Sequence, residues 1–372
     1  MALRTRSGKP VDPRKTPRGR GAAINPEGRF EKVAREAYDD GWTQDDPDDA
    51  PALKTHITEE HAASIISRNQ SPDIPFTQSI NPYQGCEHGC IYCYARPTHA
   101  YRNLSPGVDF ETRIFAKVNA AQLLRKELSR PGYKCEVISL GANTDPYQPA
   151  ERKLNITRGI LEVCNEFNQP VGIVTKNALV ERDLDILAPM AQRKLVNVFV
   201  SVNNLDHEIA RRLEPRCVAP QRRIEAIRAL AQAGVPVGVL VAPVIPFLTD
   251  DQIEAVLEAA FAAGATQAGY VVLRLPYEVK TLFRDWLERH YPLKAKHVMS
   301  RVHEFRGGRD NDPNFGSRMR GQGEFAELLS KRFAIAKRRI GYDARGRMLR
   351  NALLDTTVFR VPVESSRQMR LF

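Results

Sequence analysis

Residues 81–96 read Asn81-Pro82-Tyr83-Gln84-Gly85-Cys86-Glu87-His88-Gly89-Cys90-Ile91-Tyr92-Cys93-Tyr94-Ala95-Arg96 and place three of the chain's six cysteines at the spacing C-x3-C-x2-C. Three thiolates on one short loop can each bind one iron of a four-iron cluster and leave the fourth iron without a protein ligand. Such an iron can bind a substrate or a cofactor, whereas a four-cysteine set is typical of a structural metal or of electron transfer. The spacing therefore predicts a catalytic [4Fe-4S] cluster held by Cys86, Cys90 and Cys93.

The same cysteines have two alternative roles, as zinc ligands or in disulfides. Structural zinc could use them together with His88 or His99, but zinc ligands usually come in two separated pairs, and no second C-x2-C pair occurs in the chain. Disulfides are disfavoured because the cysteines are sparse and no apolar segment marks an export signal. We therefore expect reduced thiols and a cytoplasmic protein.

The cysteine loop resembles the cluster-binding signature of the radical S-adenosylmethionine (SAM) enzymes, including the aromatic Tyr92 just before the third cysteine. The longer string, with its Asn-Pro-Tyr lead-in and its Tyr-Cys-Tyr-Ala-Arg tail, is similar to the branch related to spore photoproduct lyase, and within it to a group of bacterial radical SAM proteins. The resemblance extends from about Phe76 to about Tyr342. It implies a [4Fe-4S] cluster, S-adenosyl-L-methionine as cofactor, its reductive cleavage to a 5′-deoxyadenosyl radical, and flavodoxin or ferredoxin as the electron donor.

Beyond the loop, apolar runs of strand length alternate with stretches that carry apolar residues at helical spacing. Strands are expected at Thr77–Tyr83, Val137–Gly141, Val171–Thr175, Val196–Val202, Val237–Ala242 and Tyr270–Leu275. Helices are expected before or between them at Asn119–Arg130, Ile156–Phe167, Gln221–Ala233 and Asp250–Ala263. Apolar strands covered by helices are typical of a parallel α/β sheet, and six units are too few for a closed eight-stranded barrel. The pattern favours a partial (β/α)6 TIM-like barrel, which the resemblance also implies, and leaves a doubly wound sheet as the alternative.

Composition divides the chain of 372 residues into unequal parts. The first 32 residues carry nine Lys or Arg against three acids and lack hydrophobic periodicity. We expect a disordered basic and then acidic arm over 1–50, a lead-in segment over 51–75, the radical SAM core over 76–300, and a basic helical extension with a tail over 301–372. A hydrophobic content of 42% and no apolar run of membrane-spanning length favour a soluble globular enzyme.

Polar residues follow several of the predicted strands, and function in such folds lies at the carboxyl ends of the strands. The turn after the second strand contains Asn143, Thr144 and Asp145, which the resemblance assigns to the methionyl amino group, although such residues also favour ordinary turns. Further cofactor contacts implied by the resemblance are Tyr92 beside the cysteines, Lys176 for the methionyl carboxylate, Ser201 and Asn203 for ribose or carboxylate, and Val244 for adenine. Solvation or core packing is the alternative role for these side chains.

Other residues bear on the substrate. Arg216 and Arg274 lie on or near the same predicted face and can bind a phosphate or a carboxylate, with structural ion pairs as the alternative. Spore photoproduct lyase has a hydrogen-donor cysteine where this chain has Ala142, so the resemblance does not extend to that repair reaction. The loop already supplies three thiolates. The remaining cysteines, Cys135, Cys164 and Cys217, are therefore not expected to bind the cluster.

Basic residues alternate with aromatic ones between Arg301 and Tyr342, which suits a polyanion with stackable bases, although many of these aromatics are also expected in the core of the extension. The last five residues, Gln368-Met369-Arg370-Leu371-Phe372, resemble the Q-x-x-L-F peptide by which bacterial DNA-processing proteins dock on the DNA sliding clamp. Three functions stay open: a radical enzyme acting on nucleic acid, one acting on a small molecule or a protein, and a non-catalytic iron–sulfur redox or sensing module.

Overall fold

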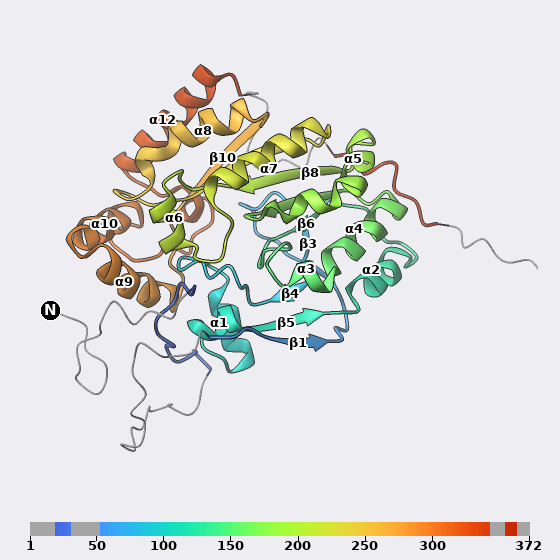
Figure 1. Cartoon of the computed structure of the whole chain (residues 1–372), viewed down its shortest axis with the longest axis horizontal. Coiled ribbons are helices and arrows are strands. Elements are labelled where there is room, and N and C mark those ends of the chain that lie inside the picture. Colours follow the sequence, from blue (N-terminus) through green and yellow to red (C-terminus); the bar gives the residue numbers. More distant parts are fainter. Residues whose placement is uncertain (1–18, 31–52, 343–353, 363–372) are drawn as a thin grey trace, which may run out of the picture.

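A seven-stranded sheet forms the centre of the protein (Figure 1). The structure is a computed structural model that describes residues 19–30, 53–342 and 354–362. The strand order is β10-β9-β8-β7-β6-β3-β2, and every neighbouring pair is parallel except β2 with β3. The strands are β2 (Ile66–Arg68), β3 (Gln78–Ile80), β6 (Ile138–Leu140), β7 (Val171–Thr175), β8 (Val196–Ser201), β9 (Val237–Val244) and β10 (Gln267–Val272).

The six parallel strands follow one another across the sheet in the order of the sequence. A doubly wound sheet reverses its strand order at a switch point, so this order excludes that alternative. Among the described residues no pairing joins β10 to β2, so the sheet stays open. The predicted partial (β/α)6 barrel is confirmed.

A smaller sheet accompanies the first predicted strand, which is split at Asn81-Pro82 into β3 and β4 (Tyr83–Gln84). Proline has no N–H to donate, so a ladder is readily interrupted there. The second part, β4, pairs with β5 (Arg113–Lys117), which in turn pairs with β1 (His56–Glu60). The cysteine loop therefore begins where the chain passes from the barrel sheet to this second sheet.

Helices follow the strands and cover the outer face of the barrel sheet (Figure 1). Those before or between the parallel strands are η3 (Arg96–Arg102), α1 (Val108–Thr112), α2 (Ala120–Leu128), α3 (Glu151–Leu154), α4 (Ile156–Phe167), η4 (Ala178–Asp183), α5 (Leu184–Gln192), α6 (His207–Leu213), α7 (Pro220–Gln232), η5 (Asp250–Gln252) and α8 (Ile253–Ala262). After the last strand come α9 (Val279–His290), α10 (Pro292–Phe305), α11 (Ser317–Arg320) and α12 (Glu324–Ile340).

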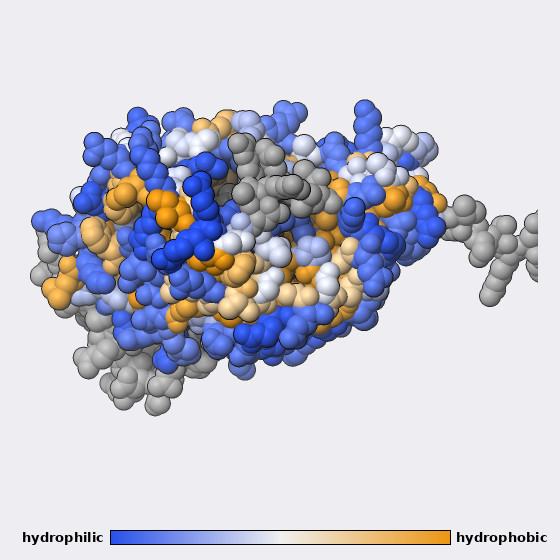
Figure 2. All heavy atoms as spheres, turned by 90° about the horizontal axis from the view of Figure 1, so that it is seen from above, coloured by the Kyte–Doolittle hydropathy of each residue, from blue (hydrophilic) through white to orange (hydrophobic). Residues whose placement is uncertain are grey.

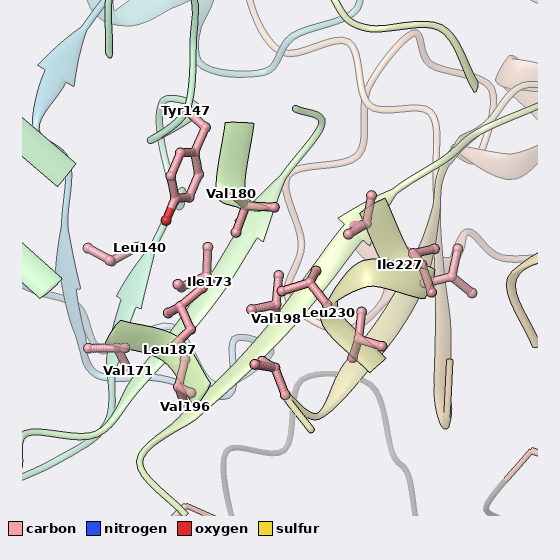
Figure 3. Close-up of a cluster of buried hydrophobic side chains, with 14 of the residues drawn as sticks. Leu140, Tyr147, Val171, Ile173, Val180, Leu187, Val196, Val198, Ile227 and Leu230 are labelled. Atoms are coloured by element: carbon pink, nitrogen blue, oxygen red, sulfur yellow. The ribbon is translucent and has the colours of Figure 1, made fainter. Parts of the chain in front are cut away.

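The main core lies between the barrel sheet and these helices (Figure 3). Alternate residues of β8, such as Val196 and Val198, point toward the helices, where they join Leu187 of α5 and Ile227 and Leu230 of α7 in one buried cluster. Burying one such side chain stabilises the fold by roughly 1.5–3 kcal/mol. The intervening residues of each strand lie on the opposite, inner face of the sheet, which is the face left for a site.

The basic extension folds onto the side of the barrel that carries β10. Helix α12 packs along α8, and the Phe333 ring lies 4.7 Å from the ring of Tyr270 in β10. Arg332 pairs with Glu254, and the Tyr342 hydroxyl donates to the Leu257 carbonyl at 2.7 Å. Part of the predicted basic and aromatic stretch is therefore structural. The face turned to the viewer in Figure 2 is largely hydrophilic with separate apolar groups.

Residues 354–362 form a strap that returns to the barrel (Figure 1). The Asp355 amide donates to the Lys194 carbonyl at 2.8 Å, and the Arg360 amide donates to the Phe167 carbonyl at 3.0 Å. Lys194 precedes β8 and Phe167 precedes β7, so the strap crosses the amino ends of the strands. It lies on the side opposite the cysteine loop, which follows β3.

Part of the expected disordered arm is instead packed into the fold. Within residues 19–30, the amides of Gly21 and Ala22 donate to the two carboxylate oxygens of Glu111 at 2.9 and 2.8 Å, and Arg20 is buried. A buried carboxylate must be satisfied by donors, and this segment supplies two of them. The other residues of the predicted arm lie outside the described ranges, as does the proposed clamp peptide.

None of the helices in the described ranges is both long enough and apolar enough to cross a lipid bilayer.

Candidate active site

The cysteine loop lies at the carboxyl ends of the parallel strands. The Cys86 amide donates to the Phe110 carbonyl at 3.0 Å, and the Thr144 hydroxyl, at the end of β6, donates to the Gly85 carbonyl at 2.9 Å. Cys86 and Cys90 are 7% exposed and Cys93 is half-buried. None of the three thiols is in a disulfide. The predicted ligands are thus together on one buried loop at the edge where such folds bind their ligands.

One buried arginine organises the backbone of this loop. The Arg96 guanidinium donates to the Cys90 carbonyl at 2.9 Å and to the Gly89 carbonyl at 3.1 Å, and it pairs with the Glu111 carboxylate at 2.5 Å. Both Arg96 and Glu111 are 0% exposed. Gly89 has φ +67°, and a Cβ there would lie 2.8 Å from a Glu111 oxygen, so only glycine fits this close approach. The protein's own contacts therefore fix the backbone of the loop.

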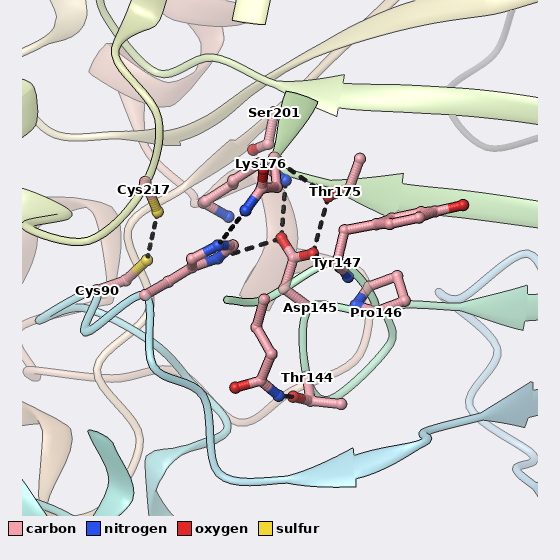
Figure 4. Close-up of polar contacts among 12 residues, drawn as sticks. Cys90, Thr144, Asp145, Pro146, Tyr147, Thr175, Lys176, Ser201 and Cys217 are labelled. Atoms are coloured by element: carbon pink, nitrogen blue, oxygen red, sulfur yellow. Dashed lines mark hydrogen bonds and ion pairs between the residues drawn. The ribbon is translucent and has the colours of Figure 1, made fainter. Parts of the chain in front are cut away.

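The turn after β6 is tied to the loop and to β7 by a carboxylate (Figure 4). Asp145 accepts from the Thr175 hydroxyl and the Lys176 amide, both at 2.8 Å, and lies 3.3 Å from Nδ1 of His88. Burial alone would raise the pKa of Asp145, but the charge of His88 and these hydrogen bonds lower it to about 2. Asp145 therefore holds three segments together rather than presenting a free carboxylate.

The two histidines that could have completed a zinc site are engaged elsewhere. His88 faces Asp145 on one side, and its Nε2 lies 3.2 Å from the amide nitrogen of Asn177. His99 is 0% exposed, its Nε2 lies 2.9 Å from the Arg113 carbonyl, and burial lowers its pKa to about 4. In the described part of the chain no three His, Cys, Asp or Glu side chains converge on a point that could hold one metal ion. A four-iron cluster takes one thiolate per iron, so this donor set fits a cluster better than a single zinc ion.

The other residues expected to contact the methionyl group differ in whether their side chains are exposed and free of hydrogen bonds within the described residues. The Thr144 hydroxyl is used by the loop, and Asn143 is held through its backbone amide, which donates to the Asn81 side chain at 2.8 Å, while its own side chain stays partly exposed. Lys176 is half-buried, and within the described residues its ammonium makes no hydrogen bond or ion pair. Burial would lower the pKa of Lys176, but the nearby Cys90 and Glu214 raise it above the ordinary value. Lys176 is thus a charged, unpaired donor beside the loop.

Residues at the ends of β8 and β9 are more buried than expected for a ligand surface. Ser201 is 1% exposed, and its hydroxyl donates to the Ala242 carbonyl at 3.3 Å. Asn203 accepts a hydrogen bond from Asn204 through its side-chain oxygen. The side-chain nitrogen of Asn203 is buried and has no acceptor among the described residues. Val244 belongs to the core cluster on the helix side, so the partly exposed Ala242, rather than Val244, is the β9 side chain on the inner face.

Sequence reasoning missed the role of Tyr94, which lies within the quoted motif. Tyr94 is half-exposed, and its hydroxyl donates a hydrogen bond to the Ala142 carbonyl. The Arg274 guanidinium lies 5.5 Å from the centre of the Tyr94 ring. Arg274 contacts the Met319 sulfur at 3.6 Å, and no carboxylate of the described residues pairs with it. Burial and the charge of Arg274 also lower the pKa of the neighbouring Arg306 to about 10. Arg274 is therefore a cation beside the Tyr94 ring that forms no ion pair within the described residues.

A buried ion pair closes the opposite side of the loop. Glu214 accepts hydrogen bonds from the Tyr92 hydroxyl and from the Arg223 guanidinium, and all three side chains are buried. Tyr92 therefore packs against Glu214, which accepts the hydrogen bond of its hydroxyl. Arg216 forms an ion pair with Glu87 at 3.2 Å. This is the structural role given above as the alternative to substrate binding by Arg216.

Comparison with known proteins agrees with this geometry. A family model described as the radical SAM superfamily matches residues 80–260. An uncharacterized protein of Mycobacterium tuberculosis is 38% identical over 298 residues, which cover 79% of this chain and 82% of that protein. An uncharacterized protein of Methanocaldococcus jannaschii is 27% identical over 243 residues, covering 64% of this chain and 85% of the relative.

Solved structures support the fold. Spore photoproduct lyase complexed with dinucleoside spore photoproduct aligns with a TM-score of 0.56 at 16% identity, over 77% of this chain and 79% of that one. A mutant of the same enzyme with bound AdoMet and the dinucleoside aligns equally well. At this identity the likeness establishes the shared architecture alone.

Proposed function

Because the chain belongs to the radical SAM superfamily, we propose that it binds a [4Fe-4S] cluster through Cys86, Cys90 and Cys93 and acts as a radical SAM enzyme. When bound, the cluster and S-adenosylmethionine supply a 5′-deoxyadenosyl radical that can abstract hydrogen from a substrate. The observation that carries the proposal is the preorganised loop, with three free thiols at the carboxyl ends of the strands.

The chain's own residues supply position and charge. Arg96 donates to the loop carbonyls and Asp145 contacts His88, so the protein's own residues hold the loop against the barrel. Lys176 is an unpaired donor for a carboxylate such as that of the methionyl group, and Asn203 has an unpartnered buried donor on the next strand. Satisfying such buried donors is favourable, because a buried polar group without a partner costs about 1–3 kcal/mol.

Uncoupled cleavage of S-adenosylmethionine tests this function. Anaerobically reconstituted protein, reduced by dithionite or by reduced flavodoxin or ferredoxin, should release 5′-deoxyadenosine and methionine in equal amounts. Iron-loaded protein that releases neither would favour the non-catalytic iron–sulfur module. Protein that binds zinc in place of iron would remove the proposal altogether.

A nucleic acid is the substrate class that we propose. Support comes from the net charge of +11, from Arg274 and Lys176, which form no ion pair within the described residues, and from the half-exposed Tyr94 ring beside Arg274. Cations bind phosphates, and aromatic rings stack on bases. A small molecule or a protein stays the alternative substrate.

Salt dependence separates these substrates. A single-stranded oligonucleotide should bind the full-length protein with an affinity that falls as salt rises, and Arg274→Gln should reduce the slope of log affinity against log salt by about one unit. Arg339→Gln is the matched control, because Arg339 lies on α12 and already pairs with Glu258. Equal slopes for both variants, or no binding, would favour the small-molecule or protein substrate.

We also propose the DNA sliding clamp as a partner through Gln368–Phe372. The strap supports this, because residues 354–362 run along the amino ends of the strands, away from the cysteine loop. Full-length protein should bind the clamp at micromolar levels and the Leu371→Ala, Phe372→Ala double variant should not. Equal binding by both proteins would contradict the assignment.

A further inference from the structure

Cys217 lies beside a predicted cluster ligand although it is 127 residues away in the sequence (Figure 4). The Sγ atoms of Cys90 and Cys217 are 3.9 Å apart. Two backbone hydrogen bonds hold the segments together: the Ile91 amide donates to the Leu213 carbonyl at 3.1 Å, and the Arg216 amide donates to the His88 carbonyl at 3.3 Å. The contact between the thiols is therefore built into the backbone.

The two thiols differ in how they can be reached from outside. Cys90 is 7% exposed, whereas Cys217 is half-buried and lines a cavity of about 190 Å³ together with His207, Arg211 and Arg223. Glu214, which accepts from the Tyr92 hydroxyl, also lines this cavity. A small reagent that enters this cavity reaches the Cys217 thiol first, because Cys217 lines the cavity and Cys90 does not.

The remaining cysteines offer no comparable pair. Cys164 is 0% exposed within the main core, and Cys135 contacts the side-chain oxygen of Gln169 at 3.6 Å. Neither thiol contacts another sulfur atom among the described residues. Cys217 is thus the thiol placed to react with a ligand of the cluster.

We propose that Cys90 and Cys217 are a redox-modification site, at which a disulfide forms in the cluster-free protein and removes one ligand from the loop. The oxidant is a low-molecular-weight disulfide that enters the cavity. The Cys217 thiolate attacks one of its sulfurs and releases one thiol, and the Cys90 thiolate then attacks the Cys217 sulfur of the mixed disulfide and releases the second. The two protein thiols lose two electrons in total, the small disulfide gains them, and the two protons pass to the released thiols.

This disulfide would act as an assembly control. A disulfide sulfur is not a thiolate ligand, so the oxidised protein cannot complete a three-thiolate loop until a reductant restores Cys90. The sulfurs must approach from 3.9 Å to the roughly 2.05 Å of a disulfide bond. The inference rests on the proposed function, because Cys90 is taken as a cluster ligand.

Peptide mapping of full-length protein tests the proposal. Protein freed of iron by a chelator under anaerobic conditions is treated with oxidised glutathione, alkylated, digested and sequenced by mass spectrometry. Two of the six thiols should be lost, and a cross-linked peptide should join Cys90 to Cys217. Iron uptake should be lost in parallel and return after dithiothreitol. Cys217→Ser should keep its iron uptake after the same treatment, and the matched control Cys135→Ser should behave like the unmodified chain.

Several outcomes would overturn the inference. Glutathione that stays on Cys217 with no cross-link, a cross-link from Cys90 to Cys86 or Cys93, or equal loss of iron uptake in Cys217→Ser would each do so. If Cys217→Ser fails to fold, the cross-linked peptide of the unmodified chain decides alone. The mapping is done without S-adenosylmethionine, so its result stands apart from whether the reduced protein is a radical enzyme.

Discussion

Replacing any one of Cys86, Cys90 or Cys93 by alanine is expected to lower the iron content from about four irons per chain to a trace and to abolish 5′-deoxyadenosine release. The reason is that each loop thiolate is proposed to bind one iron, while the carboxylate and the imidazole of the loop are already engaged, Glu87 with Arg216 and His88 with Asp145. Iron and sulfide analysis with the absorption spectrum after anaerobic reconstitution measures the first effect, and chromatography of the reaction products measures the second.

The control for this series is Cys135→Ala. Its thiol is half-buried like that of Cys93, but it lies before β6 at the amino ends of the strands. This variant should keep its iron and its spectrum. Iron retained by a loop variant, or lost equally by Cys135→Ala, would contradict the assignment of the three ligands.

The second large effect is expected at Arg96, which is fully buried. Arg96→Met should lower the free energy of unfolding by about 3–5 kcal/mol, because it leaves the buried Glu111 carboxylate without its charged partner. It also removes the donors that hold the Gly89 and Cys90 carbonyls, so the thiols should become more reactive toward an alkylating reagent. The midpoint of urea denaturation and the rate of thiol alkylation measure the two effects.

Arg102 provides the matched control, because it lies on the same short helix and also pairs with a glutamate, Glu60. That pair is partly exposed, so Arg102→Met should cost only about 0–1 kcal/mol. Similar losses for the two variants would mean that Arg96 contributes no more than an ordinary surface charge.

The parts of the fold that the sequence predicted depend on local signals. Helix α4 (Ile156–Phe167) and strand β7 (Val171–Thr175) begin and end where predicted, because apolar residues at helical spacing and a short apolar run are bounded by turn residues. The cysteine spacing is equally local. Strands β1 and β5 were not predicted, since β1 is largely exposed and has no alternation of apolar and polar residues.

The parts that could not be predicted depend on contacts between distant segments. Asp145 was expected to face the cofactor, but Thr175 and His88 arrive from other segments and use its oxygens. Val244 was expected to contact the cofactor, and its place in the core goes with a register shift between β9 and β10 after Val241. The contact between Cys90 and Cys217 leaves no local pattern at all.

The strap also bears on how the protein is made. Its hydrogen bond from Asn168 to the Val358 carbonyl joins residues 190 apart, and Phe359 packs against Phe167 and Tyr133. On a ribosome the strands β6 to β8 leave the exit tunnel long before residues 354–362 are synthesised. Phe167 and Tyr133 therefore lack their contacts with Phe359 until the strap has been synthesised. Polypeptides terminated before residue 354 never gain these contacts, and apolar surface left uncovered makes incompletely folded chains prone to aggregate.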